Sequence, residues 1–182
     1  MELQASRARL YEGMEKWAKA ADALGEIARS SERSQAQDAL RRMAEIYDRH
    51  LHLPERALET YRAIIERDPS DEASASAFAR LLESLGHWKD LELFLRRQAA
   101  RAQGEARERL LRQRVTVLEE KLGDSIAAAA ALRDLRSILP ADPDVHARLV
   151  ENLRRGGRFR EVATLLLERI TAAERRRQAR WR

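Results

Sequence analysis

The stretch DEASASAFARLLESLGHWKDLELFL, residues 71–95, decides the fold. Apolar residues recur in it at the spacing of one helix face, at Ala75, Phe78, Ala79 and Leu82. Asp71 suits the N-cap of this helix, Gly86 suits its end, and Trp88 opens a second apolar pattern. The stretch therefore predicts two helices joined by a short turn, which is a helical hairpin.

The same pattern returns 71 residues later, as DPDVHARLVENLRRGGRFREVATLL at residues 142–166. Trp17, Trp88 and Phe159 are also spaced by 71 residues. The offset relates helix breakers and apolar positions alike, as in the pairs Pro69/Pro140, Leu82/Leu153, Gly86/Gly157 and Leu95/Leu166. An ungapped match of this kind indicates a structural module of 71 residues, of which the chain holds about two and a half.

The composition favours helix throughout. Ala, Leu, Glu and Arg are abundant, and they lose little rotamer freedom in a helix. The 7 Gly and 4 Pro fall between the periodic segments. We predict an all-α fold of about ten helices in five antiparallel hairpins, at about residues 2–30, 34–68, 71–101, 105–139 and 143–173. Residues 174–182 are then a basic tail or the opening of a further repeat.

The hairpin pattern resembles the tetratricopeptide repeat, whose 34-residue unit has a small residue in its first helix and an aromatic residue opening its second. Ala75, Ala79, Gly86 and Trp88 follow that order, and the hairpin at 34–68 follows it with one extra residue in the turn near His52. The resemblance, to a bacterial-type array, implies a right-handed α-α superhelix over residues 1–173. It assigns packing between hairpins to Trp17, Ala44, Tyr47, Tyr61, Ala79, Trp88 and Phe159.

In this family the first helix of each hairpin lines a concave groove that binds a partner. The resemblance places on that groove Arg41, Glu45, Asp48, Arg49, Ser76, Arg80, Glu83, Arg112, Thr116, Glu119, Ala147, Glu151 and Arg154. Arginine suits a carboxylate partner, because its planar fork donates two parallel hydrogen bonds. The alternative is that these charges form solvated pairs within each helix, such as Arg41–Glu45. The carboxylate clamp of chaperone-docking repeats needs Lys and Asn at fixed groove positions. The only Asn is Asn152 and the corresponding positions carry no Lys, so the sequence does not predict this clamp.

The sequence does not indicate catalysis. It has no cysteine, and His50, His52, His87 and His146 lack the spacing of metal ligands. The glycines form no phosphate-binding loop, since no Lys-Ser/Thr follows Gly156-Gly157. We predict no enzyme activity, no cofactor and no metal site.

The net charge of +5 comes from the C-terminal end. Residues 1–168 carry 29 basic and 29 acidic residues, and residues 169–182 carry six Arg against one Glu. A tail with Arg175-Arg176-Arg177 and Trp181 could bind nucleic acid or an anionic membrane, and this is the alternative function. The sequence shows no signal peptide or membrane-length apolar run, so the default location is the cytoplasm.

We therefore predict a protein–protein interaction scaffold that binds a peptide or a folded partner through the groove or an edge helix. Small GTPases and other regulatory proteins are among the partners that the resemblance implies. The chain starts within a repeat and shows no polar capping helix, so we expect a segment of a longer bacterial protein. Its end hairpins could then stack on another copy.

Overall fold

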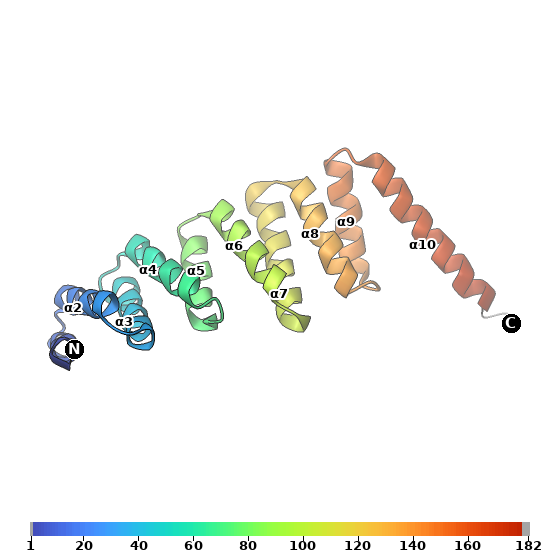
Figure 1. Ribbon diagram of the computed structural model, residues 1–182. Helices are drawn as coiled ribbons and strands as arrows, with labels where there is room; N and C mark the ends of the chain where they lie inside the picture. Colours follow the sequence, from blue (N-terminus) through green and yellow to red (C-terminus); the bar gives the residue numbers. More distant parts are fainter. Residues whose placement is uncertain (1, 180–182) are drawn as a thin grey trace. The chain divides into compact units, whose positions relative to one another are not determined.

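The computed structural model describes residues 2–179, which form ten α-helices and no strand (Figure 1). The chain divides after His87 into two compact units. Unit 1 contains α1 (Glu2–Gly13), α2 (Trp17–Ser30), α3 (Arg33–Glu45), η1 (Ile46–His50), α4 (Pro54–Arg67) and α5 (Glu72–Ser84). Unit 2 contains α6 (Trp88–Arg101), α7 (Gly104–Thr116), η2 (Val117–Leu122), α8 (Ser125–Ile138), α9 (Pro143–Arg155) and α10 (Phe159–Ala179). The predicted all-α helical-repeat fold is confirmed.

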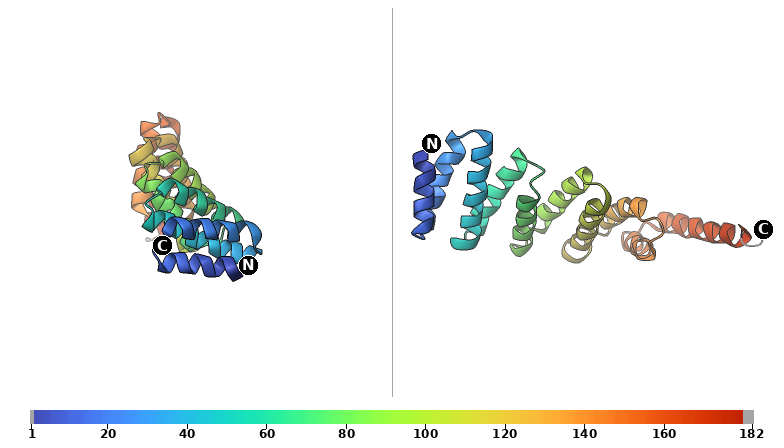
Figure 2. Two further views of the ribbon diagram at one scale, coloured as in Figure 1. Left: turned by 90° about the vertical axis from the view of Figure 1, so that its left-hand side faces the viewer. Right: turned by 90° about the horizontal axis from the view of Figure 1, so that it is seen from below.

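In unit 1 each helix packs on the next one along the chain, from α1 to α5. The right-hand view of Figure 2 shows α1, α2 and α3 in blue as neighbouring helices. Small residues bring them close together, since Ala8 and Ala20 are fully buried between larger side chains such as Leu24 and Ile46. A single hairpin cannot bury its apolar face, so this succession of contacts builds the core.

In unit 2 the same succession runs from α6 to α10. The core of this unit includes the fully buried Leu132, Leu135 and Leu149. The last helix is an exception, because α10 contacts α9 near its start and then extends away from it (Figure 1).

Helices of matching type begin 71 residues apart. Trp17, Trp88 and Phe159 each start a helix, and the other pairs of starts are Arg33 and Gly104, Pro54 and Ser125, and Glu72 and Pro143. Residues at this offset are called equivalent below.

The sequence places one extra residue in the turn near His52, and the structure takes up part of this extra length at the end of the preceding helix. The ends of α3 and α7 widen into the π-helical segments η1 and η2, where the N–H of Leu51 reaches the carbonyl of Ile46, five residues back. Each π turn accommodates one more residue than an α turn. The chain then reverses through a left-handed residue, His52 (φ 52°) in unit 1 and the equivalent Gly123 (φ 63°) in unit 2.

Candidate protein-interaction surfaces

The surface of the first helices in unit 1 is crossed by ion pairs between successive hairpins. Arg41 of α3 donates from Nε to Oδ2 of Asp71 at 2.6 Å, and it also donates to Asp38 at 2.9 Å. Asp71 is the N-cap of α5 and accepts the N–H of Ser74 at 3.0 Å. One carboxylate thus starts a helix and holds the preceding hairpin.

Unit 2 repeats this arrangement at the equivalent residues. Arg112 of α7 donates to Asp142 at 3.0 Å and to Glu108 at 3.0 Å. Asp142 caps α9 by accepting the N–H groups of Asp144 at 2.9 Å and Val145 at 3.3 Å. Since the pair recurs in both units, its role is structural. It ties the first helix of one hairpin to the N-cap of the first helix of the next hairpin.

Both capping carboxyl groups have a lowered pKa. Burial acts to raise the pKa of Asp71, but the hydrogen bonds from the Ser74 N–H and from Arg41 outweigh it. The hydrogen bond from Arg112 is the main cause that lowers the pKa of Asp142, followed by the backbone N–H of Val145. The charged carboxylates are therefore the forms that stabilise the folded chain.

A second ion pair follows along the same surface of each unit. Asp48 of η1 accepts from Arg80 of α5. The equivalent Glu119 of η2 accepts from Arg148 at 2.7 Å and from the buried Asn152 at 2.6 Å, both on α9. The predicted groove residues Asp48 and Arg80 thus pair with each other, whereas Glu119 pairs with residues that were not predicted for the groove.

The remaining groove residues differ between the units. Glu45, Ser76 and Glu83 of unit 1 are exposed. In unit 2, Glu151 accepts from Arg154 at 3.3 Å and from Arg155 at 3.0 Å, while the hydroxyl of Thr116 donates to the carbonyl of Arg112 at 3.2 Å. Of the predicted groove arginines, Arg41, Arg80, Arg112 and Arg154 therefore already hold carboxylates of their own chain.

We expect stability to depend on pH through Asp71 and Asp142. The unfolded chain takes up protons first as the pH falls, because the folded chain keeps both pKa values low. The stabilisation is therefore present above about pH 5 and is lost towards about pH 2. The variant Asp71→Asn plus Asp142→Asn, which keeps an oxygen at each N-cap, should be less stable than the native chain at pH 7 and approach it in acid.

Urea unfolding followed by circular dichroism at a series of pH values measures this difference. Glu105→Gln, in the first turn of α7, serves as a control for the loss of one charge near a helix start. If the free energies of unfolding of the double variant and the native chain differ by the same amount at every pH, Asp71 and Asp142 are not the source of the pH dependence.

The predicted packing aromatics meet the π-helical segments. The ring of Trp17 stacks on that of His50, with 3.6 Å between centroids and 12° between planes. Lys121, which is equivalent to His50, places its Nζ 5.1 Å from the centroid of the Trp88 ring. Of the other predicted packing residues, Ala44 and Tyr61 are buried, and Tyr47 and Ala79 are half-buried.

Phe159 departs from the expectation that it packs in the core, because 67% of it is exposed. The residues that cover Trp17 and Trp88 belong to the π segments of the next hairpin, η1 and η2. Within the described residues no such segment follows α10. Register alone predicted the burial of Phe159, whereas burial requires that neighbouring segment.

Phe159 begins an exposed apolar surface along α10, here called the α10 stripe: Phe159, Ala163, Leu166, Leu167 and Ile170. Their spacing of three or four residues places them on one face of the helix. Leu167 and Ile170 are 61% and 55% exposed, and Leu166 is 44% exposed. These side chains form one contiguous apolar surface on α10 that is exposed to solvent.

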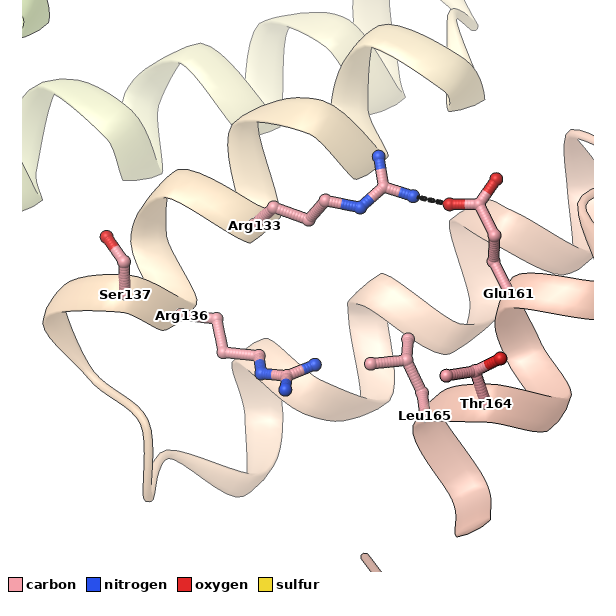
Figure 3. A pocket seen from close by; sticks show the side chains of 6 residues that line it. All are labelled: Arg133, Arg136, Ser137, Glu161, Thr164 and Leu165. Atoms are coloured by element: carbon pink, nitrogen blue, oxygen red, sulfur yellow. Dashed lines mark hydrogen bonds and ion pairs between the residues drawn. The ribbon is translucent and has the colours of Figure 1, made fainter. Parts of the chain in front are cut away.

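A cavity of about 430 Å³ lies between α8 and α10, on the other side of α10 from the stripe (Figure 3). Its lining is Arg133, Arg136, Ser137, Glu161, Thr164 and Leu165. Arg133 pairs with Glu161, and Arg136 donates to Glu168 at 2.9 Å. The two guanidinium groups are neutralised by α10, so the cavity offers no unpaired charge to an anion.

The sequence did not reveal a buried ion pair in unit 2. Arg114 of α7 donates from Nε to Glu92 of α6 at 2.8 Å, and both side chains are at least 86% buried. The equivalent residues in unit 1 are Met43 and Ala21. The only sign of this ion pair in the sequence was that Arg114 stands where the equivalent residue of unit 1 is Met43.

The histidines lie apart and in different surroundings. His50 stacks on Trp17, and His52 forms a left-handed turn. Burial lowers the pKa of His146, and the positive charges of Arg169 and Arg136 lower it further. Within the described part of the chain no three His, Asp or Glu side chains are grouped as metal ligands.

None of the helices in the described residues has the length and apolar content needed to cross a bilayer. The Arg180, Trp181 and Arg182 end of the basic tail lies outside the described residues. The structure therefore adds nothing to the nucleic-acid alternative.

No protein-family model matches the sequence, and no curated protein matches it. Solved structures with a similar fold include a crystal structure of MamA, at 13% identity over 97% of this chain and 93% of that one, with a TM-score of 0.49. MamA from Desulfovibrio magneticus RS-1 is 15% identical over 93% and 96% of the two chains, with a TM-score of 0.43. Tetratricopeptide-like repeats of a putative kinesin light chain from Podosopora anserina are 16% identical over 98% and 96%, with a TM-score of 0.47.

Proposed function

We propose that the chain is a protein-interaction scaffold that binds a helical segment of a partner along its edge helix α10. The observation that supports this proposal is the exposed α10 stripe. Its residues are equivalent to residues that another helix covers elsewhere in the chain.

The central residue of the stripe illustrates the argument. Leu166 is 44% exposed, whereas the equivalent Leu24 in α2 and Leu95 in α6 are 0% and 1% exposed. The helix after α2 is α3 and the helix after α6 is α7, and each packs on its predecessor. The surface of α10 thus has the apolar character of an inter-hairpin contact and suits an amphipathic helix.

The first-helix surface is less suited to an acidic partner. A carboxylate that binds Arg41 or Arg112 must displace Asp71 or Asp142, and each displaced group also caps a helix. Because removal of one partner from such a pair leaves the other poorly satisfied, the exchange gains little. The edge helix requires no internal contact to be broken.

A peptide from the chain itself can test the proposal. Residues 32–52 contain α3 and η1, which cover α2 in unit 1. We choose this peptide because α3 and η1 already cover α2 in unit 1, where Met43 lies against Gly25. The peptide should bind α10 in the arrangement that α3 adopts on α2.

We expect the fluorescein-labelled peptide to bind the native chain with a dissociation constant on the order of 10–100 µM in fluorescence anisotropy. Leu166→Glu should weaken binding at least tenfold, because it places a charge in the centre of the stripe. Thr171→Glu adds the same charge at the edge of the stripe, four residues after Leu167, and should weaken binding less than Leu166→Glu does. The groove variant Arg80→Glu plus Arg112→Glu should also bind.

Two results would contradict the proposal. One is the absence of saturable binding by the native chain. The other is loss of binding in the groove variant but not in Leu166→Glu, which would return the site to the first helices. A peptide with Ile46→Glu, at a position that is 4% exposed in the native contact, controls for nonspecific adhesion.

A further inference from the structure

A second exposed apolar surface lies on α1. Leu3 and Leu10 of α1 are 72% and 61% exposed, and Met14, in the turn directly after α1, is 50% exposed. Their spacing of seven and four residues places the three side chains on one side. Ala8, on another side of α1, is fully buried in the core of unit 1. We call Leu3, Leu10 and Met14 the α1 stripe.

The α1 stripe is equivalent to a surface that faces a preceding hairpin. Leu3 and Leu10 are equivalent to Val145 and Asn152 of α9, which are 1% and 3% exposed. Asn152 contacts Glu119 of η2, in the hairpin before α9. The α10 stripe is equivalent to a surface that faces a following hairpin, so the two stripes are complementary halves of one type of contact.

We propose that the α1 stripe of one copy docks on the α10 stripe of a second copy, so that chains associate head to tail. The proposal rests on the proposed function, because it names the helix that α10 receives. The contact continues an interface that the chain already makes, with α1 of the second copy in the place that α3 takes on α2.

The repeat register gives the order of contacts along this interface. With the first helices aligned by their repeat positions, Leu10 takes the place of Ile46, and Met14 takes the place of His50. His50 covers Trp17, to which Phe159 is equivalent. Met14 therefore covers the exposed ring of Phe159, and a thioether packs well against an aromatic ring.

One charged residue belongs to this face of α1. Arg7 takes the place of Met43, which lies against Gly25 of α2, and the residue of α10 equivalent to Gly25 is Leu167. Its stem can lie along the apolar surface while the guanidinium stays in water. The contact joins unlike surfaces, so both stripes of a growing assembly stay available at its ends, and the mass rises continuously with concentration.

Sedimentation velocity on the native chain and two variants tests the inference. We expect the weight-average mass of the native chain to rise above that of the monomer between about 10 and about 500 µM, as a single helix contact of modest area implies. Leu10→Glu blocks the α1 stripe and Leu166→Glu blocks the α10 stripe, and each variant should stay monomeric. An equal mixture should form a dimer and nothing larger, because one intact stripe of each kind remains. Thr171→Glu, which places the same charge at the edge of the α10 stripe, should associate more strongly than Leu166→Glu.

Each other outcome rejects the inference. A native chain that stays monomeric at every concentration excludes head-to-tail docking. If Leu10→Glu still dimerises while Leu166→Glu does not, two α10 stripes pair with each other instead. A monomeric native chain that still binds the 32–52 peptide leaves the proposed function intact and rejects only the second copy as its partner. Circular dichroism of both variants establishes that each one is folded.

Discussion

Arg114→Ala is expected to destabilise unit 2 by about 3–5 kcal/mol, because it leaves the carboxylate of Glu92 buried without its partner. This is a large part of the total stability of an ordinary domain, which is about 5–15 kcal/mol. The double variant Arg114→Met plus Glu92→Ala installs the residues of the equivalent positions Met43 and Ala21. Its free energy of unfolding should lie within about 1 kcal/mol of that of the native chain, or above it. An apolar pair often replaces a buried ion pair without loss of stability.

Urea unfolding measures this effect in a background with Trp17→Phe and Trp181→Phe, so that the fluorescence of Trp88 reports on unit 2. If the double variant is as unstable as Arg114→Ala, the loss comes from packing and the unpaired charge is not its cause. Lys121 provides a matched control: it lies over Trp88 with its charge outside the core, and Lys121→Ala should cost less than about 1 kcal/mol.

Leu24→Ala should cost about 2–5 kcal/mol, whereas the same substitution at the equivalent Leu166 should cost less than about 1 kcal/mol in dilute solution. Leu24 is fully buried in the core of unit 1, while Leu166 is 44% exposed on α10. The chemistry of the substitution and the type of helix are the same in both cases. The difference between the two losses therefore measures how much stability the covering helix α3 contributes at α2, since Leu166 on α10 has no such cover within the described residues.

The two losses follow from urea unfolding with Trp17 and Trp88 as the reporters of units 1 and 2. Other tryptophans are replaced by Phe in each background. Equal losses at the two positions would show that the α10 stripe is buried in solution even in dilute samples. A loss at Leu166 that grows with protein concentration would indicate that another copy covers the stripe.

Local spacing was enough to predict the helix starts. Trp17, Trp88 and Phe159 recur at one interval together with the Gly and Pro breakers, and short-range steric preferences decide where helices start and stop. The ends of α3 and α7 were harder to predict. An extra residue fits either a longer turn or a π turn, and the sequence alone does not distinguish these two accommodations.

Prediction of the binding surface had a different limit. The family resemblance placed Arg41 and Arg112 on the groove, but their partners Asp71 and Asp142 lie 30 residues further along the chain, in the next hairpin. Pattern within one helix does not reveal such contacts. Phe159 shows the reverse problem: its pattern is that of a core residue, but its burial depends on a helix outside its own hairpin.

The ion pairs between hairpins have a consequence for the speed of association. Charges that neutralise each other within a few ångströms produce little field beyond the Debye length of about 8 Å at physiological salt. A partner that approaches the first-helix surfaces is therefore not steered towards them from a distance. Encounter there proceeds at the unassisted rate of about 10⁵–10⁶ M⁻¹s⁻¹, and added salt changes it little. The paired arrangement that holds the hairpins together also makes recognition at these surfaces depend on contact and shape.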